Sequence, residues 1–289
     1  MKKISKFLFI VSVLFLGISC KKSDNECDSE SNVKELTKNV GKYHNEGLDY
    51  LFKKLYSLNP NKGLLRAAPS GEISSEAIVT ASYEYVQSIP EFTEIPFDAN
   101  IKEHVQELDA IRDDLTFSGV QNIWSSITND NSFKSSVPLS EQNAISEVNQ
   151  IFVNLSTSNL SPEQWYNYIK NNAMVIQSKY NLQGEAVCGL LSIMNSSNEY
   201  WHNASSLSVT TPSDPPIPLD PIIVEADCVG YLFGWGRAFW DDQTRFNNQK
   251  DFSNNANNRI MAGLWSAMSV SFVKALPPLE EPIDELPNL

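Results

Sequence analysis

The chain has 289 residues with a formal net charge of −13, and 42% of its residues are hydrophobic. So acidic a chain repels the phosphate backbone, which argues against a nucleic-acid-binding role. The hydrophobic share is large enough for a sizeable core and excludes an intrinsically disordered chain.

Residues 1–19 have the order of an export signal. Lys2, Lys3 and Lys6 come first, and an uncharged apolar run over 7–16 follows them. The run is too short for the ~20 apolar residues of a membrane-spanning helix. Small residues then close the segment, as they do before a cleavage site. The order predicts a signal peptide, whose removal would leave the chain still more acidic.

Cys20 ends this signal. The sequence Gly17-Ile18-Ser19-Cys20 resembles the lipobox of bacterial lipoproteins. The resemblance implies that the Cys20 thiol carries a diacyl lipid with chains such as palmitate. Two acyl chains would anchor the protein stably, whereas one holds only marginally. The alternative is an ordinary cleaved signal with a cysteine there by chance.

The polar stretch 20–31 is expected to be a flexible tether between lipid and fold. Its segment 21–26, Lys-Lys-Ser-Asp-Asn-Glu, resembles the export tags of Bacteroidota-type surface lipoproteins. This resemblance favours the outer membrane and leaves the periplasmic or surface face open.

Helical periodicity runs through residues 32–276. Apolar residues recur three or four positions apart, on segments around 33–51, 78–89, 101–115, 120–127, 145–155, 165–180, 187–201, 222–240 and 260–276. The clearest helix start is Ser161-Pro162-Glu163-Gln164, where serine caps, proline takes the first helical position and Gln164 completes a capping box. No other part of the chain alternates as a strand does. We therefore expect one all-α, bundle-like domain of about eight or nine helices.

Three stretches are predicted to lie outside these helices. The polar run 128–136 ends the fourth helix. The stretch 205–221 holds five prolines, which forbid a helix and favour an extended connector or a strap over the core. The acidic, proline-rich tail 277–289 is expected to be disordered.

The last two predicted helices each carry a small residue at every fourth position. These ladders are Ala226, Gly230, Gly234 and Ala238, and Gly263, Ala267, Ser271 and Ala275. Residues four apart share a helix face, so two such helices can approach closely. One interpretation is a membrane-active hairpin of 222–240 and 260–276. The other is a tightly packed central pair in a folded core, which the charges within 222–240 favour.

The cysteines allow two interpretations. Cys188 and Cys228 each fall in an apolar helical pattern. A disulfide between them would be allowed in an oxidising compartment. The alternative is two buried free thiols that behave as small apolar residues. The spacing of Cys and His suggests no metal site.

Catalytic motifs are absent from the sequence. It has no G-x-S-x-G elbow, no phosphate-binding glycine loop and no HExxH pair. His44, His104 and His202 are each expected to be structural or surface histidines. No cofactor is predicted, and an enzymatic role is disfavoured.

One segment, 222–245, embeds charges of both signs among aromatic residues. The charged residues are Glu225, Asp227, Arg237, Asp241 and Arg245. Buried charges must be paired to be tolerated, so an ion-pair lattice between helices is one explanation. The other is a polar pocket for a sugar or peptide, lined by tryptophans. The candidate pocket residues are Trp201, Glu225, Asp227, Arg237 and Asp241.

A second resemblance rests on three short stretches, 44–48, 192–201 (SIMNSSNEYW) and 227–238. They are similar to a recurring pattern in uncharacterised secreted or lipid-anchored bacterial proteins. Those proteins pair a helix ending Ser-x-x-Tyr-Trp with a glycine-ladder helix opened by an aspartate. Cys228, Tyr231 and Trp235 stand where that pattern has smaller residues. The resemblance implies a helical envelope protein and no particular activity.

Three functions follow from the sequence. The first is a non-catalytic binding or interaction module on the cell envelope, held to the membrane by its lipid, with an envelope protein, peptide or glycan as ligand. The second is a hydrolase that uses carboxylates and His44 as acid and base. The third is a membrane-active protein that inserts its last two helices.

Overall fold

The computed structural model describes residues 24–57, 73–93, 100–112, 115–180, 182, 184–208, 221–245 and 252–276. Within these ranges the side chains of 24–32, 56–57, 204–208, 241–245 and 252–255 are not described. The predicted signal peptide, Cys20, positions 209–220 of the connector and the 277–289 tail therefore lie outside the described residues.

Every regular element in these ranges is helical, which confirms the all-α prediction. The elements are α2 (Asp24–Ser57), α3 (Ser75–Ser88), the 3₁₀-helix η2 (Pro90–Phe92), α4 (Ile101–Arg112), α5 (Phe117–Thr128), α6 (Asn131–Ser136), α7 (Leu139–Ser156), α8 (Pro162–Lys179), α9 (Glu185–Ser208), α10 (Pro221–Arg245) and α11 (Phe252–Ala275). The described ranges thus hold ten α-helices, slightly more than expected. Val33–Leu289 form one compact unit and Met1–Asn32 another.

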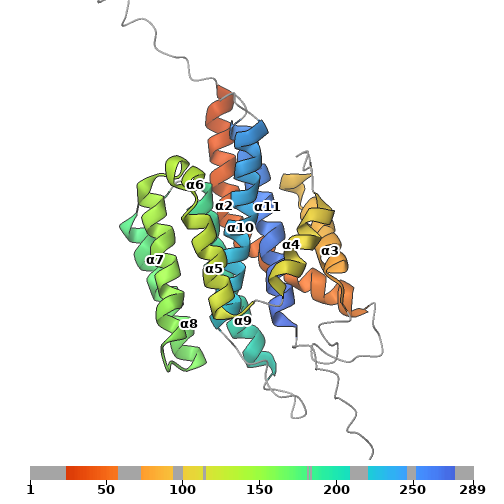
Figure 1. Ribbon diagram of the computed structural model, residues 1–289, viewed down its shortest axis with the longest axis vertical. Coiled ribbons are helices and arrows are strands. Elements are labelled where there is room, and N and C mark those ends of the chain that lie inside the picture. The colour runs from red at the N-terminus through yellow and green to blue at the C-terminus, as the bar shows by residue number, and fades with distance from the viewer. Residues whose placement is uncertain are drawn as a thin grey trace, which may run out of the picture. The chain divides into compact units, whose positions relative to one another are not determined.

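The larger unit is built around α10 and α11, which share the most extensive helix–helix contact among the described elements. Figure 1 shows this pair between two groups of helices, with α7 and α8 on one side and α3 and α4 on the other. Helix α9 lies against α10, and α8 lies against α9. The predicted central helix pair is therefore present.

Glycines bring α10 and α11 together. A Cβ at Gly234 would clash with the carbonyl oxygen of Ala262, and one at Gly230 would lie 2.9 Å from the Cα of Ala267. The ladder of α10 therefore faces α11 as expected. The ladder of α11 does not simply mirror it, because Gly263 makes room for the ring of Tyr231.

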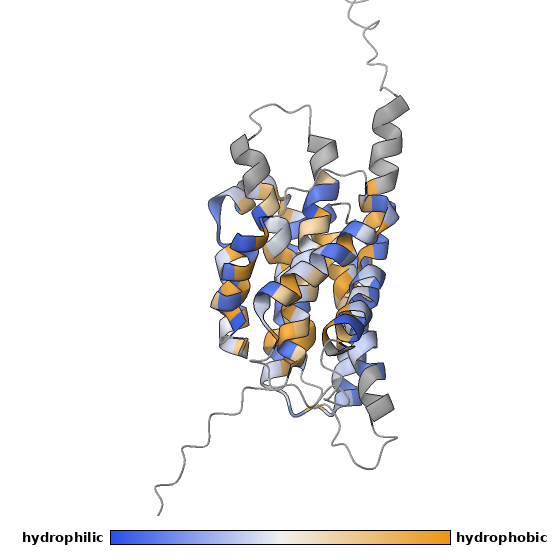
Figure 2. Cartoon of the chain, turned by 90° about the vertical axis from the view of Figure 1, so that its right-hand side faces the viewer, coloured by the Kyte–Doolittle hydropathy of each residue, from blue (hydrophilic) through white to orange (hydrophobic). Residues whose placement is uncertain are grey.

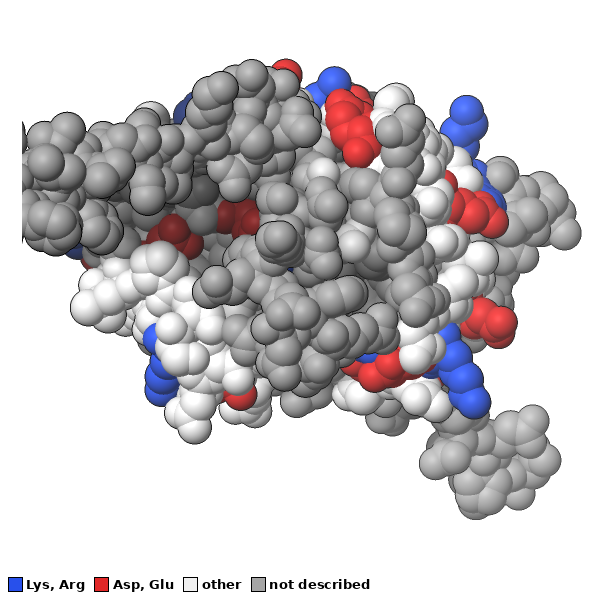
Figure 3. Space-filling model, turned by 90° about the horizontal axis from the view of Figure 1, so that it is seen from above, with Lys and Arg blue, Asp and Glu red and all other residues white. Residues whose placement is uncertain are grey.

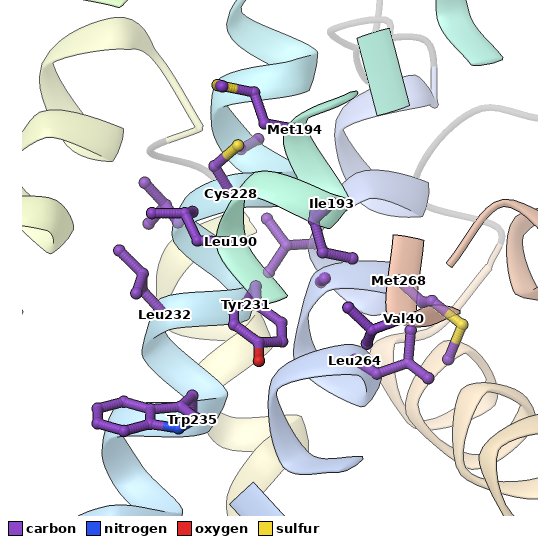
Figure 4. Packing of buried hydrophobic residues seen from close by; sticks show 14 of the residues in the cluster. Val40, Leu190, Ile193, Met194, Cys228, Tyr231, Leu232, Trp235, Leu264 and Met268 are labelled. Carbon is purple, nitrogen blue, oxygen red and sulfur yellow. The ribbon is translucent and has the colours of Figure 1, made fainter. Parts of the chain in front are cut away.

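Apolar side chains fill the space between the helices. Figure 2 shows that hydrophobic residues concentrate on the inward faces of the described helices. In the close view of Figure 4, Tyr231 of α10 points toward labelled side chains of α9 and α11. The described helices include none that is long and apolar enough to cross a membrane.

Three elements differ from the sequence-based prediction, and one of them is α9, which ends at Ser208 and so includes the first four residues of the predicted connector 205–221. Helix α6 lies within 128–136, which was predicted to be an irregular polar run. It forms because the Asp130 carboxylate accepts hydrogen bonds from the backbone N–H groups of Ser132 and Phe133, and the Phe133 side chain is buried. Helix α2 begins at Asp24, within the predicted tether, and not near Asn32.

Candidate functional site

A groove with a volume of about 610 Å³ lies between α2 and the end of α8, and α9 forms its floor. Its described lining residues are Lys34, Thr37, Lys38, Gln177, Tyr180, Leu182, Cys188, Leu191, Ser192, Asn195 and Ser196. This volume falls in the range of about 300–1,000 Å³ that is typical of small-molecule sites.

The floor of the groove is held to α2 by backbone contacts. Ser192 Oγ donates a hydrogen bond to the Lys38 carbonyl oxygen at 2.9 Å and accepts one from the Gly41 N–H at 3.0 Å. A Cβ at Gly41 would clash with the Ser192 carbonyl, so α2 and α9 are in close contact here. This close packing fixes the α2 wall of the groove against its floor.

Several polar groups in the groove are available to a ligand. Among the described residues, neither the Gln177 nor the Asn195 side-chain amide has a hydrogen-bond partner, and the Lys38 ammonium has no carboxylate partner. Tyr180 differs, because its hydroxyl donates to Glu147 at 2.7 Å. The groove can therefore offer an ammonium group and two amides to one molecule.

A second polar cluster surrounds Asp227 and is closed to solvent. Its carboxylate accepts hydrogen bonds from Ser197 Oγ and, at 3.2 Å, from Trp201 Nε1. His44 Nε2 lies 3.7 Å from Asp227 Oδ2, and both side chains are fully buried. Burial raises the pKa of Asp227, and the opposing effects of His44 and its hydrogen-bond donors do not cancel that increase.

This geometry bears on the hydrolase alternative. An acid–base role for His44 needs a carboxylate within hydrogen-bond reach in a cleft that a substrate can enter. His44 has no solvent-exposed area, and its separation from Asp227 exceeds hydrogen-bond length. The other ring nitrogen, Nδ1, lies 3.1 Å from Asn45 Oδ1. The arrangement gives the hydrolase alternative no support.

The remaining candidate pocket residues do not gather around Asp227. Glu225 accepts a hydrogen bond of 2.6 Å from Gln121 Nε2 and is buried. Arg237 forms ion pairs with Glu103 and Glu107 of α4. The side chain of Asp241 lies outside the described residues. Of the five candidates, the structure thus brings Trp201 and Asp227 together, while Glu225 and Arg237 join other helix pairs.

The other two histidines also connect helices. The His104 ring lies on Trp265 with ring centroids 4.1 Å apart, and burial lowers its pKa. The His202 ring stacks on Tyr166 at the same centroid distance. Among the described residues, no three His, Cys, Asp or Glu side chains converge as a metal site would require.

Cys188 and Cys228 are both free thiols in the structure, and Cys188 is only partly buried, unlike the two buried thiols of the second alternative. Cys228 is buried and Cys188 lines the groove. Burial raises the pKa of Cys188 to about 11, so its thiol is a weak nucleophile at neutral pH.

Sequence reasoning did not identify the groove. Its lining residues come from helices that are far apart in the chain, so no local motif marks them. One signal was present, because Ser192, Asn195 and Ser196 place polar groups three and four residues apart on one face of the helix. Such spacing indicates a polar strip on one helix face.

Comparison with known proteins adds no relative. No protein-family model matches the chain, and neither the curated proteins nor the solved structures contain a match. The function must therefore be argued from the residues of this chain.

Proposed function

We propose that the protein is a lipid-anchored cell-envelope lipoprotein whose helical domain is a non-catalytic binding module, with the groove between α2, α8 and α9 as its ligand site. The anchoring part of the proposal is supported by the order of residues in 1–20, and the outer membrane by the polar segment that follows Cys20.

One observation carries the binding part. The groove combines a volume of about 610 Å³ with polar groups that have no described partner. Polar groups in a recess are usually satisfied within the protein, by water or by a ligand. The polar groups around Asp227 are buried away from solvent and could not receive a ligand without a large rearrangement.

Ligand-observed NMR with a defined panel of sugars, amino acids, dicarboxylates and short peptides would test this proposal on the mature protein. Asn195→Trp should fill the groove and abolish the signals of the bound compounds. Ser178→Trp is the matched control, because Ser178 is exposed on α8 and does not line the groove. Binding to no panel compound, or binding that Asn195→Trp leaves unchanged, would contradict the assignment of this groove.

A further inference from the structure

We infer that the groove selects a small polar organic molecule with one anionic group, which sits against the α2 wall at Lys38. The inference rests on the proposed function and adds the chemical class of the ligand. It is carried by the charge of the lining residues, their positions on the helices and their hydrogen bonds.

The charge of the groove is opposite to that of the chain. The sequence has 35 acidic and 22 basic residues, yet the described lining residues include two lysines and no Asp or Glu. Other charged residues of the domain are mixed by sign, as the described side chains on the face in Figure 3 show. The groove is therefore a local positive region on an acidic protein, where an anion is favoured over a neutral or cationic ligand.

The lysine partners sharpen this contrast. Lys42 of α2 pairs with Glu46, Lys54 pairs with Glu84, and Lys179 pairs with Glu147. Lys38 has no such partner among the described residues. Its charge is therefore available to a ligand.

Lys34 adds a second positive charge to the α2 wall beside Lys38. Lys34 and Lys38 are four residues apart on α2, so their side chains leave the same helix face about 6 Å apart. Both charges also act on the Cys188 thiol, where they oppose the rise in its pKa that burial and the Glu141 carboxylate produce. The opposite wall holds the C-terminal end of α8, which carries partial negative charge and would repel an anion. The anionic group is thereby directed to the α2 wall.

The rest of the groove fits a polar body. The amides of Gln177 and Asn195 can each donate and accept hydrogen bonds, and they match hydroxyl or amide groups of a ligand. Leu182 and Leu191 add apolar lining that can contact the carbon skeleton of the ligand. A sugar acid and a sugar phosphate share this chemistry, since each joins one anionic group to a hydroxylated body.

The experiment compares three probes on one sugar framework, D-glucuronate, D-glucose 6-phosphate and D-glucose, by calorimetry with the mature protein. At least one of the two anions should bind at least about tenfold more tightly than glucose, because a hydrogen bond to a charged group is worth more than a neutral one. The carboxylate and phosphate arms identify which anion the groove takes.

Lys38→Gln should lower the affinity for the preferred anion at least about tenfold and leave the affinity for glucose unchanged. Lys42→Gln is the matched control, since Lys42 lies one turn away, is exposed and does not line the groove. Added salt should weaken anion binding to the wild-type protein, a readout that needs no variant.

The outcomes separate this inference from the proposed function. Groove-dependent binding of glucose or of other neutral panel compounds, without a preference for the anions, would overturn the inference and leave the binding module intact. Failure of all three probes would also overturn the inference. Failure of the whole panel would overturn the proposed function as well.

Discussion

A single buried carboxylate, Asp227, joins four helices. Ser197 and Trp201 come from α9 and His44 from α2, and the Ser271 hydroxyl of α11 acts to lower the Asp227 pKa. Burying an ionised carboxylate is costly unless partners compensate for lost hydration. The raised pKa of Asp227 means that this compensation is incomplete.

We therefore expect the stability to depend on pH through Asp227. Between the ordinary pKa of 3.8 and the raised pKa of the folded state, the folded protein holds a proton that the unfolded chain has released. Stability should then fall as pH rises through this window, by at most about 1.4 kcal/mol per pH unit for one proton. Asp227→Asn should remove this decline, measured as the free energy of unfolding in urea at a series of pH values.

Asp109→Asn is the control for this measurement, because Asp109 is exposed on α4. Its pH profile should run parallel to that of the wild-type protein. His44, whose Nε2 lies 3.7 Å from Asp227 Oδ2, is present in all three proteins. A parallel profile for Asp227→Asn would show that Asp227 does not carry the pH dependence.

At this scale the sequence predicted some partners and missed others. Trp201 and Asp227, two of the five candidate pocket residues, are in contact, and both come from segments where charge and aromatic residues mix. Glu225 and Arg237 could have been separated in advance, since twelve residues of helix place them about 18 Å apart. Ser197, one turn before Trp201, gave no signal because serine is common on helix surfaces.

The contact between α10 and α11 depends on the absence of side chains. At Gly234 the backbone of α11 leaves no space for a side chain, because the Ala262 carbonyl oxygen cannot move without shifting the helix. Two residues along, Gly236 has its nearest neighbouring atom, a methyl of Ile127, at 3.7 Å from an added Cβ. These two glycines are therefore a matched pair on one helix.

Gly234→Ala should destabilise the protein by about 1–3 kcal/mol, the usual cost of overpacking a core. Gly236→Ala should be neutral or stabilising by up to about 1 kcal/mol, because alanine is the better helix former and fits the available space. Urea denaturation of both variants measures the difference. If the Gly234→Ala and Gly236→Ala variants had equal free energies of unfolding, the close approach of α10 and α11 at Gly234 would not limit the side chain there.

The start of a helix could be predicted where the sequence holds a capping motif, and it could not be predicted where no such motif is evident. The capping box of α8 was identified to the residue, with Ser161 and Gln164 in reciprocal hydrogen bonds. Helix α6 was missed because its six residues are too short to show a periodic pattern. The glycine ladder predicted a close helix pair, but spacing alone did not indicate that Gly263 would receive Tyr231.

On the scale of the whole molecule, the groove could not be predicted. It forms where the end of α8 and the first half of α2 pass over α9, and their relative positions result from packing across the entire core. Periodicity predicts which face of a helix is buried but not which helix covers it. The fold class was therefore accessible from the sequence and the binding site was not.

The proposed anchoring makes a prediction at the same scale. Cys20→Ser should abolish metabolic labelling with a palmitate analogue and release the protein from the membrane fraction, because the acylated thiol would be gone. Cys27→Ser is the matched control, and it should keep both the label and the membrane association. If the Cys20→Ser protein were still labelled, Cys20 would not be the lipidated residue, and the proposed anchoring site would be wrong.

The contact of α2 with α9 has a consequence for the order of events after synthesis. The Gly41 N–H meets a serine 151 residues later in the chain, and the Trp265 indole donates to the Val79 carbonyl across 186 residues. Contacts of such separation make folding slow, since long loops must close before they contribute. If the protein is exported as proposed, a chain that leaves a translocation channel N-terminus first would therefore keep the part of α2 around Gly41 uncovered until Ser192 of α9 had crossed. During that interval it would be a natural client for an envelope chaperone.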